Sequence, residues 1–114
     1  MFQSMAATTF EVLAEPTRRR ILDLLLERSR AVGELVELLG MSQPGVSKHL
    51  RVLREGGFVD VHADAQRRFY ELRPGPLHEV DAWLAPYRRL WAARLDALER
   101  HLEETADPDG KEHR

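Results

Sequence analysis

The sequence predicts a mainly helical fold that contains one small β-hairpin, and three observations support this prediction. Apolar residues recur three and four residues apart through the first half of the chain. Gly56 and Gly57 end that period, and two short aromatic and β-branched segments follow at 58–62 and 68–72. After Pro74-Gly75-Pro76 the helical spacing returns and continues to Leu102.

The size of the chain predicts one domain, residues 1–104, followed by a polar tail. The chain has 114 residues, of which 43% are hydrophobic and 32% charged, as in soluble globular proteins. No apolar run approaches the roughly 20 residues that span a membrane, and residues 1–10 lack the features of a signal peptide. We therefore expect a cytoplasmic protein. Residues 105–114, which hold Pro108 and Gly110, are expected to be disordered.

The composition argues against catalysis. The chain has no cysteine, which excludes disulfides, thiolate metal sites and cysteine nucleophiles. It has neither a glycine-rich phosphate loop nor a recognisable Ser/His/acid or paired-carboxylate arrangement. We therefore expect no enzyme and no cofactor. The net charge of −2 is unusual for a nucleic-acid binder, but residues 16–73 hold 11 Lys and Arg against 8 Asp and Glu.

Three helices are predicted before residue 40. The first covers residues 5–13. The second begins near Pro16 and runs to Leu26, and its apolar residues occupy several sides, which predicts a central position. The third covers residues 31–39 and ends at Gly40, a natural helix stop.

The next helix, which follows a short turn, has two different faces. Ser42 is a good N-cap, and Val46, Leu50 and Leu53 recur at helical spacing toward a core. A polar front of this kind suits the DNA major groove. Gln43 and Arg51 suit base edges, whereas the serines and the lysine suit phosphates or bases. The predicted DNA-contacting residues are Ser42, Gln43, Pro44, Gly45, Ser47, Lys48, His49 and Arg51. His49 has two interpretations, contact with phosphate or packing beside Leu53.

The two segments after Gly57 are predicted to form a hairpin whose loop, 63–67, acts as a wing. The element order is then that of a winged helix-turn-helix. Arg67 and Arg68 are expected to meet phosphate or a narrow minor groove, although ordinary hairpin-end charges would look the same. Tyr70 is expected in the core. Arg18 and Arg19 have two equal interpretations, phosphate contact or pairing with Glu15 or Asp23.

A long amphipathic helix is predicted to begin near Leu77. Its apolar stripe exceeds what a small domain needs to cover its own core, which favours dimerisation. Pro86 should kink or divide this helix. Trp83, Tyr87 and Trp91 could line a pocket for a small apolar effector, but an interface is the more common use of such a stripe. The predicted dimer interface comprises Phe10, Leu77, Val80, Leu84, Tyr87, Trp91, Leu95 and Leu98.

The chain resembles the ArsR-type (ArsR/SmtB-like) family of bacterial winged-helix repressors over roughly residues 10–100. The segments that carry the resemblance are 13–22, 32–35, 41–53 and 67–72. The resemblance implies a homodimer, built from the first and last helices, that binds a two-fold symmetric operator in double-stranded DNA.

Two departures from the family pattern stand out. Metal-sensing members carry two cysteines at positions that match Ala31 and Gly33, and neither residue here ligates metal. The last helix also lacks the later ligands of the interfacial metal site, since Arg88, Arg89, Ala92 and Ala93 occupy that region. We expect no metal site, because His62, His78, His101 and His113 show no ligand spacing. A second departure is Ala65 at the wing tip, where the family commonly has glycine.

The predicted function is that of a homodimeric, sequence-specific DNA-binding transcriptional regulator, most simply a repressor of its own or a neighbouring promoter. The alternative is a protein-interaction module that uses the winged fold for assembly. In that case the long helix would be the working surface. The sequence indicates neither the operator nor an inducing signal, and leaves the small-molecule effector unknown.

Overall fold

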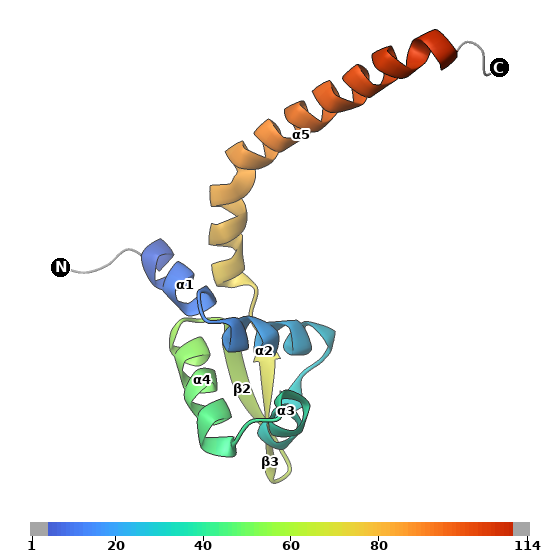
Figure 1. The fold of residues 1–114 in the computed structure, drawn as a ribbon. Coiled ribbons are helices and arrows are strands. Elements are labelled where there is room, and N and C mark those ends of the chain that lie inside the picture. The colour runs from blue at the N-terminus through green and yellow to red at the C-terminus, as the bar shows by residue number, and fades with distance from the viewer. Residues whose placement is uncertain (1–4, 111–114) are drawn as a thin grey trace. The chain divides into compact units, whose positions relative to one another are not determined.

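The computed structural model describes the backbone of residues 5–110 and the side chains of residues 9–106. Its elements follow the order α1 (Met5–Leu13), α2 (Pro16–Glu27), β1 (Arg30–Ala31), α3 (Val32–Leu39), α4 (Gln43–Glu55), β2 (Val59–Asp64), β3 (Arg67–Leu72) and α5 (Gly75–Gly110) (Figure 1). The chain forms two compact units, one that ends at Val80 and one that begins at Asp81. The second unit consists of most of α5.

The core of the first unit lies among α1–α4 and the start of β2. Ile21 and Leu25 of α2, Leu35 of α3 and Phe58 before β2 are almost completely buried in it. Tyr70 of β3 packs against this core, which confirms its predicted position. The fold is therefore the predicted one, mainly helical with a small antiparallel sheet and the element order of a winged helix-turn-helix.

The sheet contains one strand that the sequence did not predict. β1, only two residues long, pairs antiparallel with β3, and the strand order is β1-β3-β2. Consequently Ala31 belongs to the sheet, and α3 begins at Val32 rather than at Ala31. The guanidinium of the buried Arg30 donates to the Leu24 carbonyl at 3.0 Å and pairs with the Glu27 carboxylate at 2.7 Å. These contacts compensate for the burial of its charge.

Glutamates stabilise the first turns of α2 and α3. The Glu15 carboxylate accepts hydrogen bonds from the backbone N–H groups of Thr17 (2.7 Å) and Arg18 (3.4 Å). In α3 the Glu34 carboxylate accepts from the Ala31 N–H and pairs with Arg28. The hydrogen bond from Arg28, followed by that from Ala31, lowers the pKa of Glu34 below its ordinary value. Both helices thus satisfy N–H groups that lack intrahelical partners.

α5 extends further than the sequence predicts, and of the two expectations for Pro86, a kink or a division, the structure excludes the division. The helix runs through Pro86 without interruption, so the proline removes one backbone hydrogen bond without dividing it. It also continues to Gly110, whereas disorder was expected from Thr105. The rest of that predicted tail, 111–114, lies outside the described residues. Between residues 5 and 110, no helix combines the length and the apolar character that crossing a membrane requires.

Candidate nucleic-acid interface

A tight turn leads from α3 into α4. Gly40 ends α3 in the left-handed region (φ 66°), where glycine carries no steric penalty, and its N–H donates to the Val36 carbonyl at 2.9 Å. Ser42 then caps α4, because its hydroxyl accepts from the Gly45 N–H at 3.2 Å. Pro44 lies in the first turn of α4, where its missing N–H has no helical partner. The helix therefore begins where the sequence predicts.

The back of α4 holds the helix in one orientation. Val46, Leu50 and Leu53 are at most 1% exposed and belong to the core. Their burial at helical spacing forces the opposite face outward. That face carries Gln43, Ser47, Lys48 and Arg51, all exposed. We name the set Ser42, Gln43, Pro44, Gly45, Ser47, Lys48 and Arg51 the recognition surface.

The cations of the recognition surface have no acidic partner among the side chains that the structure describes. Lys48 and Arg51 form no ion pair within residues 9–106, and together with Pro44 and Ser47 they line an open hollow of about 420 Å³. By contrast, Arg28, Arg30, Arg73 and Arg88 all pair with carboxylates of the same chain. Charge at this surface is therefore available to an external anion.

The hairpin forms a wing with a two-residue turn. β2 and β3 pair from Val59–Leu72 to Asp64–Arg67, so Ala65 and Gln66 make the turn. Ala65 has φ +60°, the one positive φ of a non-glycine residue in the described chain. A positive φ at the first turn position alone fits a type II′ turn, which favours glycine there.

Arg67 and Arg68 lie on opposite faces of the wing, because successive strand residues alternate. The Arg67 guanidinium lies 5.2 Å from the ring centroid of Phe69, which stacks on His62 across the strands. Arg68 shares the face of Tyr70. Both arginines are exposed, but they cannot face one DNA groove in the same way.

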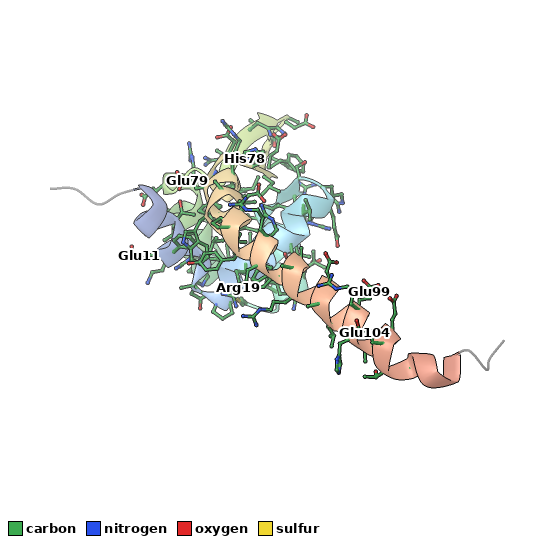
Figure 2. The ribbon with its side chains drawn as sticks, turned by 90° about the horizontal axis from the view of Figure 1, so that it is seen from above. Glu11, Arg19, His78, Glu79, Glu99 and Glu104 are labelled. Carbon is green, nitrogen blue, oxygen red and sulfur yellow. The ribbon has the colours of Figure 1, made fainter. Side chains whose placement is uncertain are left out.

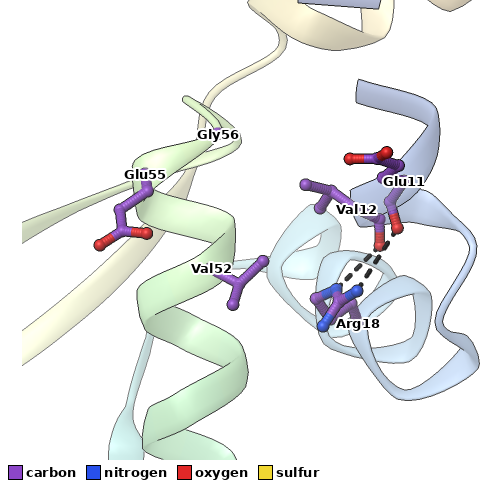
Figure 3. A pocket seen from close by; sticks show the side chains of 6 residues that line it. All are labelled: Glu11, Val12, Arg18, Val52, Glu55 and Gly56. Carbon is purple, nitrogen blue, oxygen red and sulfur yellow. Dashed lines mark hydrogen bonds between the residues drawn. The ribbon is translucent and has the colours of Figure 1, made fainter. Parts of the chain in front are cut away.

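Arg18 and Arg19 hold the end of α1, a role that neither sequence interpretation included. The Arg18 Nε donates to the Val12 carbonyl at 2.8 Å, and its Nη2 donates to the Glu11 carbonyl at 3.4 Å (Figure 3). Arg19 donates to the Leu13 carbonyl at 2.7 Å. Carbonyls at a helix C-terminus lack intrahelical partners and attract cations. Arg18 also borders a hollow of about 320 Å³ between α1 and α4 (Figure 3).

His49 connects α4 to α2. This half-buried side chain places Nδ1 3.4 Å from Nη1 of Arg18. Glu15 lies near His49. Burial raises the pKa of the Glu15 carboxyl, but the hydrogen bonds from Thr17 and Arg18 and the nearby charges of His49 and Arg18 hold this pKa below its ordinary value. The contact with Arg18 indicates a positioning role for His49 within the fold.

Arg20 is a candidate that the sequence reasoning missed. Its exposed side chain lines a hollow of about 230 Å³ together with Thr17 and with Met41, the residue before the α4 cap. The sequence offers one indication of this grouping: Thr17 and Arg20 lie three residues apart and therefore on one face of α2. The sequence alone gives no reason to separate Arg20 from its two neighbours.

The predicted dimer residues fall into two groups. Leu77 packs against the core of the first unit, Val80 and Leu84 are half-buried, and Phe10 is 37% exposed. The others lie on α5 with roughly half or more of their surface exposed, namely Tyr87, Trp91, Leu95 and Leu98. The His, Asp and Glu side chains within the described part of the chain form no group of three that could hold a metal ion.

Comparison with known proteins agrees with this architecture. The sequence pattern of the arsR family of bacterial regulatory proteins matches residues 15–61. The chain is 32% identical over 75 residues to the transcriptional repressor SdpR of Bacillus subtilis. The aligned region covers 66% of this chain and 83% of SdpR. It is 36% identical over 101 residues to the HTH-type transcriptional regulator Rv0081 of Mycobacterium tuberculosis. That alignment covers 88% of this chain and 86% of Rv0081.

A solved structure shows the same fold. The homodimeric winged helix-turn-helix DNA-binding domain of Mb0332 from Mycobacterium bovis superimposes with a TM-score of 0.59 and 28% sequence identity. The match covers 88% of this chain and 83% of that one. The family identity favours a regulator over the alternative of an interaction module. The chain therefore belongs to the arsR family of bacterial regulatory proteins and is a DNA-binding transcriptional regulator with a winged helix-turn-helix.

Proposed function

We propose that this regulator is a homodimeric repressor that binds a two-fold symmetric operator through the recognition surface of α4. The proposal rests on Lys48 and Arg51, two exposed cations of α4 that have no acidic partner within residues 9–106. The opposite face of this helix is buried in the core, which fixes the direction of both side chains. Repression follows if the operator overlaps a promoter. SdpR is named a repressor, and the Mb0332 domain is a homodimer.

The roles of the contact residues follow from their chemistry. The Gln43 amide combines a donor and an acceptor, which suits an adenine edge in the major groove, and the two parallel donors of the Arg51 guanidinium suit a guanine edge. Ser47 and Lys48 suit phosphates beside those bases, and the N-cap Ser42 and the close-packed Gly45 set the entry of the helix. Arg67, Arg68 and Arg20 supply further phosphate contacts. The protein acts by occupying DNA in the cytoplasm, and it catalyses no reaction.

A mobility-shift titration with DNA from upstream of the regulator's own coding sequence tests this function. A dimer that neutralises about 6–10 phosphates should lose at least about a thousandfold in affinity between 50 and 200 mM salt. Footprinting of the same DNA should show protection with two-fold symmetry. Binding that is absent, or that does not respond to salt, would contradict the proposal.

The matched variants separate the recognition surface from the rest of the protein. The double substitution of Lys48 and Arg51 by alanine should abolish the shift. Arg89→Ala, which removes an exposed arginine from α5, should leave it unchanged. Equal loss in both variants would mean that binding depends on overall charge instead of on α4.

A further inference from the structure

The recognition surface carries one positive charge that acylation can remove. Of the 17 Lys and Arg residues of the chain, only Lys48 and Lys111 are lysines. The other cations that the proposed function assigns to DNA are arginines, whose guanidinium keeps its proton and its charge. A lysine ammonium can release a proton, and the resulting amine can form an amide. Lys48 is therefore the cation at which the charge of this surface can be changed covalently.

The Lys48 side chain is accessible to a reagent. It is exposed, and it makes no ion pair within residues 9–106. The neighbouring turns of α4 are anchored by Val46 and Leu50, which are at most 1% exposed and point into the core. A change at the Lys48 Nζ therefore leaves the packing of the helix intact.

The surroundings of Lys48 suit a phosphate group. Pro44, Ser47, Lys48 and Arg51 line an open hollow of about 420 Å³, and none of these four residues is acidic. Arg51 lies three residues after Lys48, so the two cations are neighbours on one face of the helix. The Ser47 hydroxyl and the Arg51 guanidinium are donors of the kind that bind phosphate oxygens. A small molecule that carries a phosphate can therefore be held beside the Lys48 Nζ.

We propose that this hollow binds an acyl phosphate and that the Lys48 Nζ accepts its acyl group, which weakens DNA binding. The second half of this inference rests on the proposed function. In an acyl phosphate the carbonyl carbon is attached directly to the phosphate. A phosphate bound by Ser47 and Arg51 therefore places that carbon next to the amine. In an acyl thioester of coenzyme A, a long arm separates the carbonyl from the phosphates, so the same contacts would not position it.

The reaction is a simple acyl transfer. The Lys48 ammonium first releases a proton to water, and the free electron pair of Nζ attacks the carbonyl carbon. A bond forms between nitrogen and carbon, and the bond between that carbon and the phosphate oxygen breaks with its electron pair on the oxygen. The second proton of the nitrogen goes to the phosphate, which leaves as hydrogen phosphate. The product is a neutral amide, and nothing is oxidised or reduced.

Acylation and DNA binding should oppose each other. Each copy of the chain loses one cation at the DNA backbone, and each phosphate contact contributes about 0.9 to the slope of log affinity against log salt. The slope of a homodimer should therefore fall by about 2 after acylation of both copies. In the other direction, bound DNA covers the hollow, so the operator should protect Lys48 from the reagent.

Acetyl phosphate is the probe for the site. The full-length protein is incubated with it, and peptide mass spectrometry follows the acetylation of Lys48 and of Lys111, which lies outside the described residues. Lys48 should react at least about tenfold faster, because charge-assisted hydrogen bonds hold the donor there. Excess inorganic phosphate should slow this reaction. Arg51→Ala should lower the rate at Lys48 to that at Lys111.

Arg100→Lys provides the matched control, because it places an exposed lysine on a part of α5 that is acidic. Glu99 and Glu104 project from that part of the helix (Figure 2). Acetyl phosphate should modify position 100 slowly. N-acetoxysuccinimide, a neutral ester without phosphate, should modify positions 48 and 100 at similar rates. Preference for Lys48 with both reagents would mean a reactive amine without a phosphate site, and it would overturn the inference. Equal rates at all lysines with acetyl phosphate would overturn it too.

The mobility-shift titration on the same samples separates this inference from the proposed function. Salt-dependent DNA binding by a protein whose Lys48 shows no preference would overturn the inference and leave the function in place. Selective acetylation of a protein that binds no DNA before treatment would overturn the function and leave the acyl phosphate site in place. Unchanged affinity and salt slope after complete acetylation of Lys48 would overturn the proposed weakening of DNA binding.

Discussion

The arginines and the lysine of the first unit divide according to what they contact. Arg18 and Arg19 donate to carbonyls at the end of α1, and Arg30 is buried against Glu27. Lys48 and Arg51 make no ion pair within residues 9–106. A cation that binds carbonyl or carboxylate groups of its own chain stabilises the fold, whereas a cation without such partners is available to bind DNA.

Arg51 is expected to read a base. Arg51→Ala should therefore reduce the discrimination between the operator and single-base variants by about 1–3 kcal/mol at one position of the site. Fluorescence anisotropy with the footprinted operator and its variants measures this difference. Arg89→Ala serves as the control of equal charge. An equal loss of affinity on every sequence would instead make Arg51 a phosphate contact.

Ala65 is expected to store strain in the wing. A left-handed conformation costs a non-glycine residue about 1–2 kcal/mol, while glycine loses about 0.4–1 kcal/mol through its more flexible unfolded state. Ala65→Gly should therefore raise the free energy of unfolding by up to about 1 kcal/mol.

Urea denaturation measures the change, with Gln66→Gly as the matched control. Gln66 lies in the same turn but does not have a positive φ. Its replacement should therefore lower stability. If both glycine variants are destabilised equally, the wing stores no strain at Ala65.

The sequence predicts the contacts of some cations and not of others. The exposure of Lys48 and Arg51 follows from helical period, because Val46, Leu50 and Leu53 fix the opposite face. No period distinguishes Arg18, Arg19 and Arg20. Their contacts depend on where the carbonyls of α1 and the turn before α4 lie, which is a tertiary arrangement.

The N-terminal caps determine where the helices begin. Glu15 precedes α2 and accepts from two backbone N–H groups, although glutamate is not among the preferred N-cap residues. These hydrogen bonds hold its folded-state pKa below the ordinary value of 4.5, so folding favours the charged form. His49 and Arg18 lie nearby and favour the same form.

Glu15→Gln should therefore lower Tm most near pH 7. The stabilisation by the carboxylate is fully present above the unfolded-state pKa and is lost as the pH falls through the lower folded-state pKa. The difference in Tm between the wild type and Glu15→Gln should shrink as the pH is lowered below 4.5. Thermal denaturation followed by circular dichroism at several pH values measures it.

Glu37→Gln provides the matched control, because Glu37 is an exposed glutamate on α3. Its Tm should follow that of the wild type at each pH. A Tm difference for Glu15→Gln that stays constant down to pH 3 would mean that the charge of the cap has no part in stability.

The elements with strong local signals were predictable, and those set by distant pairing were not. α4 begins one residue after its predicted cap, and α1 has the predicted bounds. β1 escaped prediction because two residues cannot show a period, and its partner Tyr70 lies 40 positions away in the chain. Toward the turn, β2 extends two residues and β3 one residue further than expected, since Ala65 accepts a positive φ.

The proposed DNA-reading surface and most of the predicted dimer stripe lie in different compact units of the molecule. The core that supports α4 lies within the unit that ends at Val80, and the exposed apolar residues Tyr87, Trp91, Leu95 and Leu98 lie in the unit that begins at Asp81. The length of α5 was underestimated because the polar residues after Thr105 gave no apolar period to follow. If α5 pairs the two copies, as predicted, the reading surface of α4 can change without loss of assembly.

This separation has a genetic consequence. A chain with alanine at Lys48 and Arg51 but an intact α5 would still pair with wild-type chains. Each mixed dimer would hold one functional half and one silent half, and would bind a two-fold operator poorly. Such an allele is expected to be dominant negative in a cell that also carries the normal gene. An allele that replaces Trp91 and Leu102 by alanine would instead encode a chain that does not pair with wild-type chains, and it would be recessive.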